Sequence, residues 1–478
     1  MIEQLRKGLI YTTLGQYGNV LVNFIVNAIL SRILTPKEYG IVAVISVFIV
    51  FFQVLSDMGI GPSIIQNKML TQVDVNNIFG FSFYISLLLS VIFIFIGVFL
   101  STAYSNPIYN SLSPILSISL FFYTLNIVPQ AILKKDKMFK TLNIILVVSA
   151  LFSGSFGILF SCLGFGVYSL VWMTVINSIM AFIFTFINSK ILFKLTFRKE
   201  SLAMVSGFAK NQFGFGIVNY FSRNTDTILI GKFIGGEAVG SYNKAYQLLM
   251  YPATIFNGII NPVLQPILSE FQEDVVRIKT IYLKIIHFLM LLGIPISIYL
   301  SMNSQRIIFF IFGNQWSDSV YPFSILALSI WTQMVAVTTS SIFQARNKTN
   351  LLLISGLINS TIIITLVIIG VIFQSIDLVA TLLSFGYFFT LCVTFYFLLY
   401  KVLNSNFYEL VNEMINSIFI GMGTFITMLL YNEFTQESNF GSLVSSFIIF
   451  SFIYFILLYY TKEYKFILSF INKKEEKQ

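Results

Sequence analysis

The sequence predicts an all-α integral membrane protein of about 14 transmembrane helices. These form two pseudo-symmetric six-helix lobes around a central cavity, plus a C-terminal helix pair. Three observations predict this: a composition too apolar for a water-soluble surface, repeated long apolar runs, and an internal repeat. Of the 478 residues, 56% are hydrophobic and only 10% are charged, whereas soluble domains carry about 25% charged residues. The mean hydropathy is +0.84.

The apolar runs are about 20 residues long, which indicates membrane helices rather than the alternating strands of a barrel. Spans are predicted near residues 9–31, 40–60, 77–101, 112–133, 141–161, 165–189, 207–234, 238–262, 280–301, 319–342, 350–373, 377–400, 410–430 and 440–460. The seventh and eighth are the least hydrophobic. The loops between them are short, so no soluble catalytic domain is expected.

The distribution of the 29 lysines and arginines fixes the orientation. With the N-terminus in the cytoplasm, 23 of the 29 fall on the cytoplasmic side, in keeping with the positive-inside rule. Arg223 lies within a span, and five lie on the other side: Arg32, Lys37, Lys232, Lys244 and Arg306. We therefore expect a multi-pass protein of the bacterial cytoplasmic (inner) membrane with both termini in the cytoplasm.

The net charge of +9 belongs mostly to cytoplasmic loops that face anionic membrane lipids, so no nucleic-acid partner is expected. Cys162 and Cys392 lie in or beside apolar spans, and His287 is the only histidine. A disulfide framework, a metal site and a histidine-based catalytic triad are therefore not expected. We expect a monomer.

An internal repeat appears at an offset of 200 residues. The segment ILSRILTPKEYG from Ile29 aligns without a gap with LIGKFIGGEAVG from Leu229, so that Gly40 falls on Gly240. Because the offset carries the first span onto the seventh, the repeat is parallel, with its axis along the membrane normal. The predicted divisions are residues 1–200, residues 201–400, and residues 401–478 with the last two helices and a basic cytoplasmic tail.

Both repeats carry a polar face inside the membrane. Helical spacing places Asn19, Asn23 and Asn27 on one face of the first span, and Asn219, Arg223 and Asp226 on one face of the seventh. Amides within the membrane often only bond a neighbouring helix. A charge costs about 2.5–3.5 kcal/mol at the helix centre and usually faces a bundle interior or a water-filled cavity. Two interpretations of Arg223 and Asp226 stay open: a structural ion pair, and a contact with an anionic substrate.

Other polar residues are less informative. Arg32 and Lys232 lie at the external ends of their spans, where long side chains normally reach the interface. Asp57 lies near the cytoplasmic end of the second span, as a gate or as an interfacial residue. The chain has no phosphate-binding P-loop, and its first external loop has no paired acids. We therefore expect a transporter and no enzyme.

The segment NYFSRNTDTILIGKFIGGEAVGSYNKAYQLLMYPATIF from Asn219, SRILTPKEYGIVAV from Ser31 and PQAILKKDKMFK from Pro129 resemble the Wzx-type polysaccharide flippases. That family handles O-antigen, capsule or teichuronic acid repeat units, within the multidrug/oligosaccharidyl-lipid/polysaccharide exporter superfamily. The resemblance implies an undecaprenyl-pyrophosphate-linked glycan as substrate, moved from the inner to the outer leaflet. It implies that Arg223 and Asp226 line the cavity, and Arg32 and Lys232 are candidates to hold the headgroup later. A polysaccharide polymerase and chain-length machinery are the expected protein partners.

Neighbouring branches leave alternatives. Ion-coupled multidrug exporters usually have twelve spans and an acid in the first, but residues 9–31 contain none. A lipid II-type flippase has fourteen spans, but its early Arg-Asp pattern is not reproduced after Ser31. A scaffold role in polysaccharide assembly is a third alternative. No cofactor is expected; coupling to H⁺, Na⁺ or the membrane potential is a hypothesis, with Asp57 or Asp226 as the coupling residue.

Overall fold

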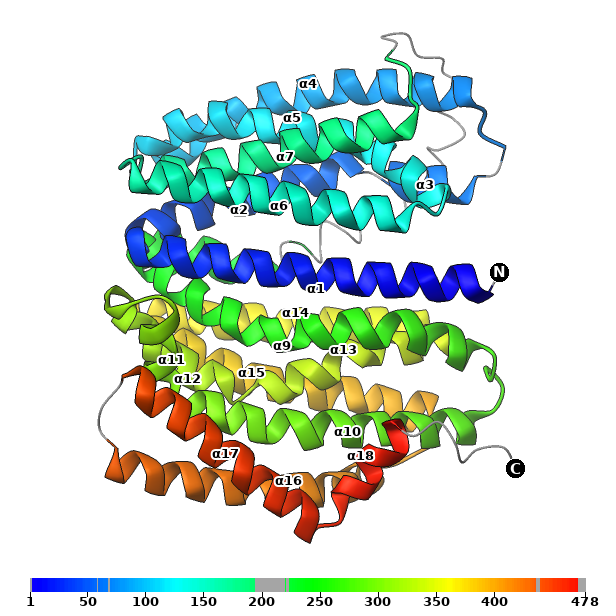
Figure 1. The fold of residues 1–478 in the computed structure, drawn as a ribbon, viewed down its shortest axis with the longest axis vertical. Coiled ribbons are helices and arrows are strands. Elements are labelled where there is room, and N and C mark those ends of the chain that lie inside the picture. Colours follow the sequence, from blue (N-terminus) through cyan, green and yellow to red (C-terminus); the bar gives the residue numbers. More distant parts are fainter. Residues whose placement is uncertain are drawn as a thin grey trace. The chain divides into compact units, whose positions relative to one another are not determined.

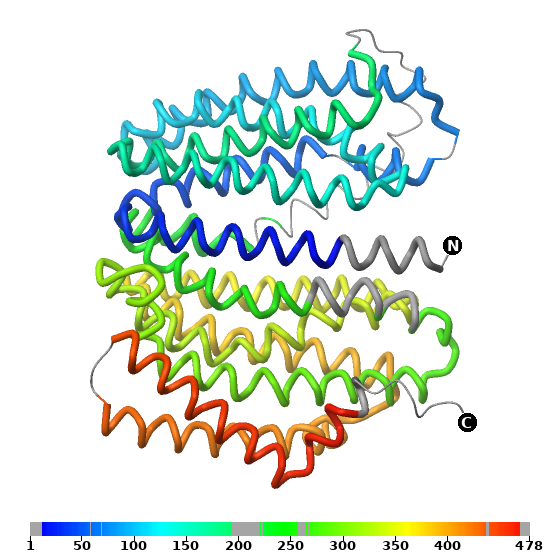
Figure 2. Tube along the Cα trace, viewed as in Figure 1, coloured from blue at the N-terminus to red at the C-terminus, as the bar shows by residue number. Residues whose placement is uncertain are grey.

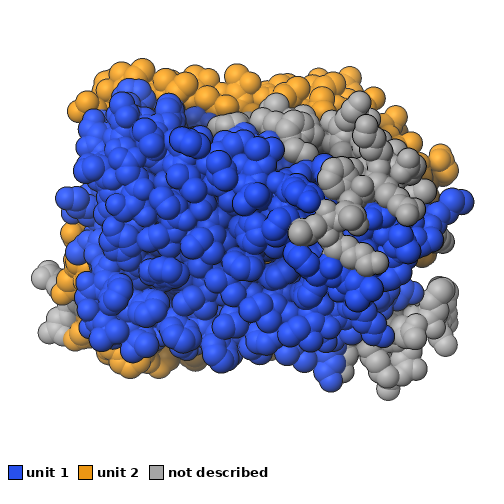
Figure 3. Space-filling model, turned by 90° about the horizontal axis from the view of Figure 1, so that it is seen from above, with its two compact units in different colours: residues 1–240 blue, residues 241–478 orange. Residues whose placement is uncertain are grey.

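A computed structural model describes residues 2–57, 59–67, 69–193, 220, 223–435 and 439–471, and these form helices and connecting turns without a strand (Figure 1, Figure 2). The chain divides into two compact units, residues 1–240 and 241–478, coloured separately in Figure 3. The predicted lobe boundary at residues 200 and 201 lies outside the described residues. The division into residues 1–200, 201–400 and 401–478 therefore stays a prediction.

The first unit is a bundle centred on α5. Its helices are α1 (Ile2–Ile33), α2 (Pro36–Asp57), α3 (Ile60–Gln66), α4 (Gln72–Ala103), α5 (Ile108–Lys135), α6 (Phe139–Cys162) and α7 (Val167–Ser189). Residues 223–233 are also helical. α5 packs against α4 and α7, and α6 packs against α7 and α1 (Figure 1). Small residues allow the α1–α6 approach, because a Cβ on Gly15 would overlap Asn143 and one on Gly154 would overlap Val26.

Turn chemistry sets where these helices begin and end. α4 starts with a capping box in which the Asp74 N–H donates to the Thr71 hydroxyl at 3.3 Å and the Thr71 N–H donates to the Asp74 carboxylate at 3.0 Å. Two residues after the end of α4 and of α5 stands a residue with left-handed backbone, Ser105 (φ 51°) and Lys137 (φ 57°) respectively. The backbone N–H of the next residue then donates to a carbonyl near the end of the helix. In α5, the Met138 N–H donates to the Leu133 carbonyl at 2.9 Å.

The second unit is built around α10, which packs against α16, α13 and α12. Its helices are α9 (Gly236–Ser269, whose first turn belongs to the first unit), α10 (Val275–Met302), α11 (Ser304–Ile311), η1 (Asn314–Ser319), α12 (Val320–Ala327), α13 (Ile330–Ala345), α14 (Thr349–Ile372), α15 (Ile376–Tyr396), η2 (Phe397–Val402), α16 (Phe407–Phe434), α17 (Phe440–Tyr460) and α18 (Glu463–Ile471).

Within the described residues, ten helices are long and apolar enough to cross a membrane, or eleven if one bent pair counts as a span. The chain is thus a multi-pass membrane protein. The predicted spans 9–31, 207–234 and 238–262 are not among the eleven. The count of fourteen therefore stays a prediction.

The predicted span at residues 319–342 falls on this bent pair, so the structure adds a break that the prediction of a continuous helix lacked. Here η1 and α12 are followed by α13 at an angle of 56°. The break at Leu328 and Ser329 releases backbone groups from the regular helix pattern. The Trp331 N–H donates instead to the Ser297 hydroxyl of α10 at 3.1 Å. The break is therefore stabilised by a neighbouring helix that hydropathy cannot reveal.

The structure reproduces the register of the repeat in its helix ends. α1 ends at Ile33 and α2 begins at Pro36; the helix 223–233 ends at Phe233 and α9 begins at Gly236. Both ends thus keep the offset of 200 residues that the sequence predicts.

The two copies also contact each other at this point. A Cβ on Gly40 would overlap the Gly236 carbonyl and lie 3.1 Å from the Gly240 nitrogen. Reciprocally, a Cβ on Gly240 would overlap the Pro36 carbonyl and lie 3.1 Å from the Gly40 nitrogen. We name this contact the glycine crossing. Its reciprocity is what a two-fold relation between segments 36–40 and 236–240 produces, and only glycine permits so close a backbone approach.

Candidate functional site

The polar face predicted for the first span is present on α1. The Asn23 side chain donates to the Asn19 carbonyl at 2.9 Å and to its Oδ1 at 3.0 Å, and Asn27 donates to the Asn23 carbonyl at 2.9 Å. Ser31 continues the series by donating to the Asn27 carbonyl at 2.6 Å. Asn19, Asn23 and Asn27 are half-buried. The helix itself therefore satisfies part of their hydrogen-bonding capacity, while side-chain oxygens along the face remain able to accept from a ligand.

Arg223 and Asp226 lie in different environments on the helix 223–233. Arg223 is exposed, whereas Asp226 is buried at 8% exposure and its Oδ1 accepts the Thr227 N–H at 2.7 Å. Among the described residues, no ion pair joins the two side chains, and both interpretations of Arg223 and Asp226 stay predictions. Asn219, the third residue predicted for this face, lies outside the described residues.

The helix end sets the depth of Arg223. At about 1.5 Å per residue, Arg223 lies about 15 Å before the end of its helix at Phe233. Asn23, its partner at the offset of 200, lies the same distance before the end of α1 at Ile33. Since the hydrocarbon core of a bilayer is about 30 Å thick, the predicted spans 9–31 and 207–234 would place both residues near its middle.

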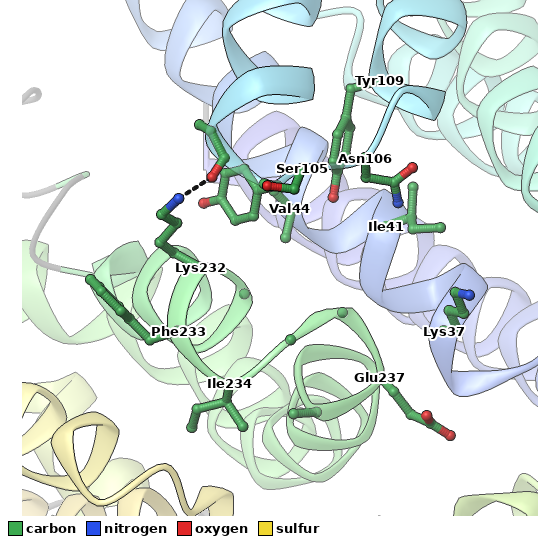
Figure 4. A pocket seen from close by; sticks show the side chains of 16 residues that line it. Lys37, Ile41, Val44, Ser105, Asn106, Tyr109, Lys232, Phe233, Ile234 and Glu237 are labelled. Carbon is green, nitrogen blue, oxygen red and sulfur yellow. Dashed lines mark hydrogen bonds between the residues drawn. The ribbon is translucent and has the colours of Figure 1, made fainter.

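Three turns meet at the end of the first unit where α2 begins; we name it the outer end because the predicted orientation places it outside the membrane. Residues from 37–44, 103–109 and 231–238 line one cavity there (Figure 4). The Lys232 ammonium donates to the carbonyl of Ala103, the last residue of α4. A cation at a helix C-terminus complements the helix dipole, which gives Lys232 a structural task. Arg32 is exposed in the last turn of α1 and does not line this cavity.

Asp57 ends α2, at the opposite end of that helix from Pro36. It is half-buried and lines a cavity of about 250 Å³ with α3 and α5. The α5 side of this cavity carries Tyr123, Asn126, Gln130 and Lys134, at helical spacing. Lys134 donates to the Gln130 Oε1 at 3.3 Å. Among the described residues Asp57 accepts no hydrogen bond, and its role as gate or coupling residue stays a prediction.

Two polar clusters in the second unit were not predicted from the sequence. The buried Lys244 ammonium lies 4.8 Å from the centroid of the Phe312 ring and 5.2 Å from that of Trp316. His287 of α10 contacts the Glu413 carbonyl of α16 and the Glu463 carboxylate of α18, both at 2.8 Å. His287 and Trp316 can be read from the sequence, but their partners Glu413, Glu463 and Lys244 lie far from them along the chain.

The described residues contain no group of three or more His, Cys, Asp or Glu side chains that could hold a metal ion. Cys162 and Cys392 are free thiols.

Comparisons with known proteins agree with the fold. By structure, the chain is similar to the lipid II flippase MurJ in an inward closed conformation, with a TM-score of 0.77, 16% identity, and 95% of this chain and 99% of that chain covered. It is also similar to an inward-facing multidrug resistance MATE family transporter of the MOP superfamily. That match has a TM-score of 0.64 and 14% identity and covers 79% of this chain and 93% of that one. At these identities the likeness concerns the fold alone.

By sequence, the chain is similar to the teichuronic acid biosynthesis protein TuaB of Bacillus subtilis (strain 168), with 25% identity and 73% of both chains covered. It is also similar to the lipopolysaccharide biosynthesis protein WzxC of Escherichia coli (strain K12), with 23% identity and 72% of this chain and 70% of that one covered. The family described as polysaccharide biosynthesis protein matches residues 29–321, more than half of the chain. This confirms the resemblance seen at Ser31 and Arg223, and the chain therefore belongs to the polysaccharide biosynthesis protein family.

Proposed function

We propose that this protein is a flippase for undecaprenyl-pyrophosphate-linked oligosaccharide repeat units. It moves them from the inner to the outer leaflet of the bacterial cytoplasmic membrane for surface polysaccharide biosynthesis. In this proposal one binding site is exposed alternately to the two sides of the membrane, and fourteen spans leave both termini in the cytoplasm.

Arg223 is the observation that carries the proposal. In the proposed topology it lies near the middle of the bilayer; its side chain is exposed, and among the described residues it has no ion-pair partner. A charge at that depth costs about 2.5–3.5 kcal/mol unless it faces water or an anion. At an effective dielectric constant of about 20, one phosphate charge at 4 Å offsets this with about 4 kcal/mol. The guanidinium plane also matches phosphate oxygens in a bidentate manner.

The α1 face supports the same ligand. Asn23 occupies the position in the first repeat that Arg223 occupies in the second, at the same depth. Neutral amides suit the hydroxyl groups of a glycan, whereas a guanidinium suits its pyrophosphate. We therefore assign the anionic contact to Arg223 and the hydroxyl contacts to the asparagines.

The relatives support the substrate class. Their names refer to teichuronic acid and lipopolysaccharide biosynthesis, two polymers outside the cytoplasmic membrane. For energy coupling we keep Asp57 and Asp226 as the candidate groups for an ion gradient, with the membrane potential as the alternative.

The test uses a strain from which the gene is deleted, complemented with wild type, Arg223→Ala or Arg223→Lys. We expect Arg223→Ala to reduce surface polysaccharide at least tenfold and to leave lipid-linked repeat units on the cytoplasmic face. Arg223→Lys keeps the charge without the bidentate geometry and should retain part of the export. Arg277→Ala, which removes an exposed arginine in the first turn of α10, is the matched control.

Membrane abundance of each variant is measured by immunoblot, so that failed insertion is not mistaken for failed export. Normal surface polysaccharide in the deletion strain would overturn the proposed function. Normal export by Arg223→Ala at normal abundance would remove Arg223 from the binding site.

A further inference from the structure

The cavity at the outer end of the first unit has a volume of about 550 Å³ and is built from three separate segments (Figure 4). Its walls are the first turns of α2, the turn between α4 and α5, and residues 231–238. Small-molecule sites in proteins range from about 300 to 1,000 Å³. The cavity is therefore large enough for a ligand of one or a few sugar rings.

Three polar side chains in this cavity have hydrogen-bonding capacity to spare. Within the described part of the chain, the Lys37 ammonium and the Glu237 carboxylate make no hydrogen bond or ion pair. The Asn106 Oδ1 accepts the Ile108 N–H at 3.2 Å, so the N–H donors of its Nδ2 stay available to a ligand. Lys37 and Glu237 lie on one side of the cavity and Lys232 on the other (Figure 4). The site thus offers a cation, an amide donor and an anionic acceptor.

The rest of the cavity is fixed and unobstructed. The Tyr104 hydroxyl donates to the Ile228 carbonyl at 3.2 Å, and its ring lies 5.8 Å from that of Tyr109. Burial raises the pKa of Tyr104 to about 12, so this hydroxyl stays a neutral donor. A Cβ on Gly235 or Gly236 would meet no atom within 4 Å, so nothing fills the space beside them.

This combination selects among ligand classes. An apolar drug would bury the three polar groups without partners, which is unfavourable. A bare phosphate would meet Lys37 but would be repelled by the Glu237 carboxylate. A saccharide presents hydroxyls that both donate and accept, and its apolar C–H faces suit the tyrosine rings.

We propose that the outer-end cavity binds a saccharide, namely the glycan part of the transported substrate after it has crossed the membrane. Lys37 and Asn106 donate to sugar oxygens, Glu237 accepts from sugar hydroxyls, and Tyr104 and Tyr109 form an aromatic wall. Lys232 links residues 231–238 to the end of α4 by donating to the Ala103 carbonyl, and in this proposal it is not a ligand. That the saccharide is the transported glycan rests on the proposed function. That the cavity binds a saccharide rests on its side chains alone.

The test measures saccharide binding to purified full-length protein in lipid nanodiscs by saturation-transfer NMR and calorimetry. The probe is the oligosaccharide repeat unit released by mild acid from the lipid-linked pool of the source strain. We expect Lys37→Gln and Glu237→Gln each to weaken its binding about tenfold. Asn106→Asp keeps the oxygen that caps α5 but loses the donor, and it should weaken binding without loss of stability. Glu433→Gln, an exposed carboxylate outside the cavity, should bind like wild type.

The outcomes separate this site from the proposed function. Equal affinity in wild type, Lys37→Gln and Glu237→Gln would overturn the site, even in cells that export glycan normally. Binding that these variants weaken would support the site, even if the deletion strain kept its surface polysaccharide and the flippase proposal failed. Maltose serves as a free-sugar control; binding of maltose as tight as the repeat unit would overturn the assignment to the transported glycan.

Discussion

Replacing Gly40 by alanine tests the close approach of two backbone segments in the first unit. At the glycine crossing, the new Cβ would overlap the Gly236 carbonyl and lie 3.1 Å from the Gly240 nitrogen. Both are backbone atoms, so no side chain can rotate to make room, and α2 must move away from the start of α9. Overpacking of this kind costs about 1–3 kcal/mol.

Thermal unfolding of the full-length protein in detergent, followed by intrinsic fluorescence, measures this cost. For a unit of this size about 1 kcal/mol corresponds to roughly 2–4 °C, so Gly40→Ala should unfold roughly 2–12 °C below wild type. Gly356→Ala is the matched control, since a Cβ at Gly356 in α14 meets nothing within 4 Å. Alanine is also the better helix former, so this control should unfold at or above the wild-type temperature.

A second substitution sharpens the test. Gly240→Ala strains the same crossing from the other side, where its Cβ overlaps the Pro36 carbonyl. Once one substitution has separated the backbones, the second should cost less, so the double variant should be less destabilised than the sum of the single ones. A wild-type unfolding temperature for Gly40→Ala, or full additivity of the two substitutions, would contradict the glycine crossing.

Three further predictions concern other parts of the chain. If ion coupling runs through a carboxylate, Asp57→Asn or Asp226→Asn should slow glycan export in cells, and normal export by both variants would end that hypothesis. Glu463→Ala leaves a buried imidazole without its 2.8 Å partner and should cost about 1.5–3 kcal/mol in thermal unfolding, whereas Glu463→Gln should retain most of the stability. Ser297→Ala removes the acceptor at the α12–α13 break and should cost about 1–3 kcal/mol; an unchanged unfolding temperature would show that the break does not depend on it.

The sequence by itself determined the features that depend on local chemistry. Apolar runs of about 20 residues suffice to predict membrane helices. Ten helices of the described residues, or eleven with the bent pair, follow these runs, whereas the predicted spans 9–31, 207–234 and 238–262 are not among them. The repeat at Gly40 and Gly240 predicted helix ends that recur at the same offset, because turn residues act within a few positions. The face shared by Asn19, Asn23 and Asn27 follows from helical spacing alone.

The tertiary structure decided which polar side chains have partners. Sequence spacing left Arg223 and Asp226 as a candidate ion pair, yet one is exposed and the other is buried. The headgroup contact of Lys232 stays a prediction, and only the structure shows that this side chain donates to the carbonyl of Ala103, a residue more than a hundred positions earlier in the chain. Lys37 was only one of five predicted external cations and Glu237 was not singled out, whereas the structure places both in one cavity formed by three distant segments. Hydropathy and periodicity describe a residue and its near neighbours along the chain, whereas burial, hydrogen bonding and cavity shape depend on segments that only folding brings together.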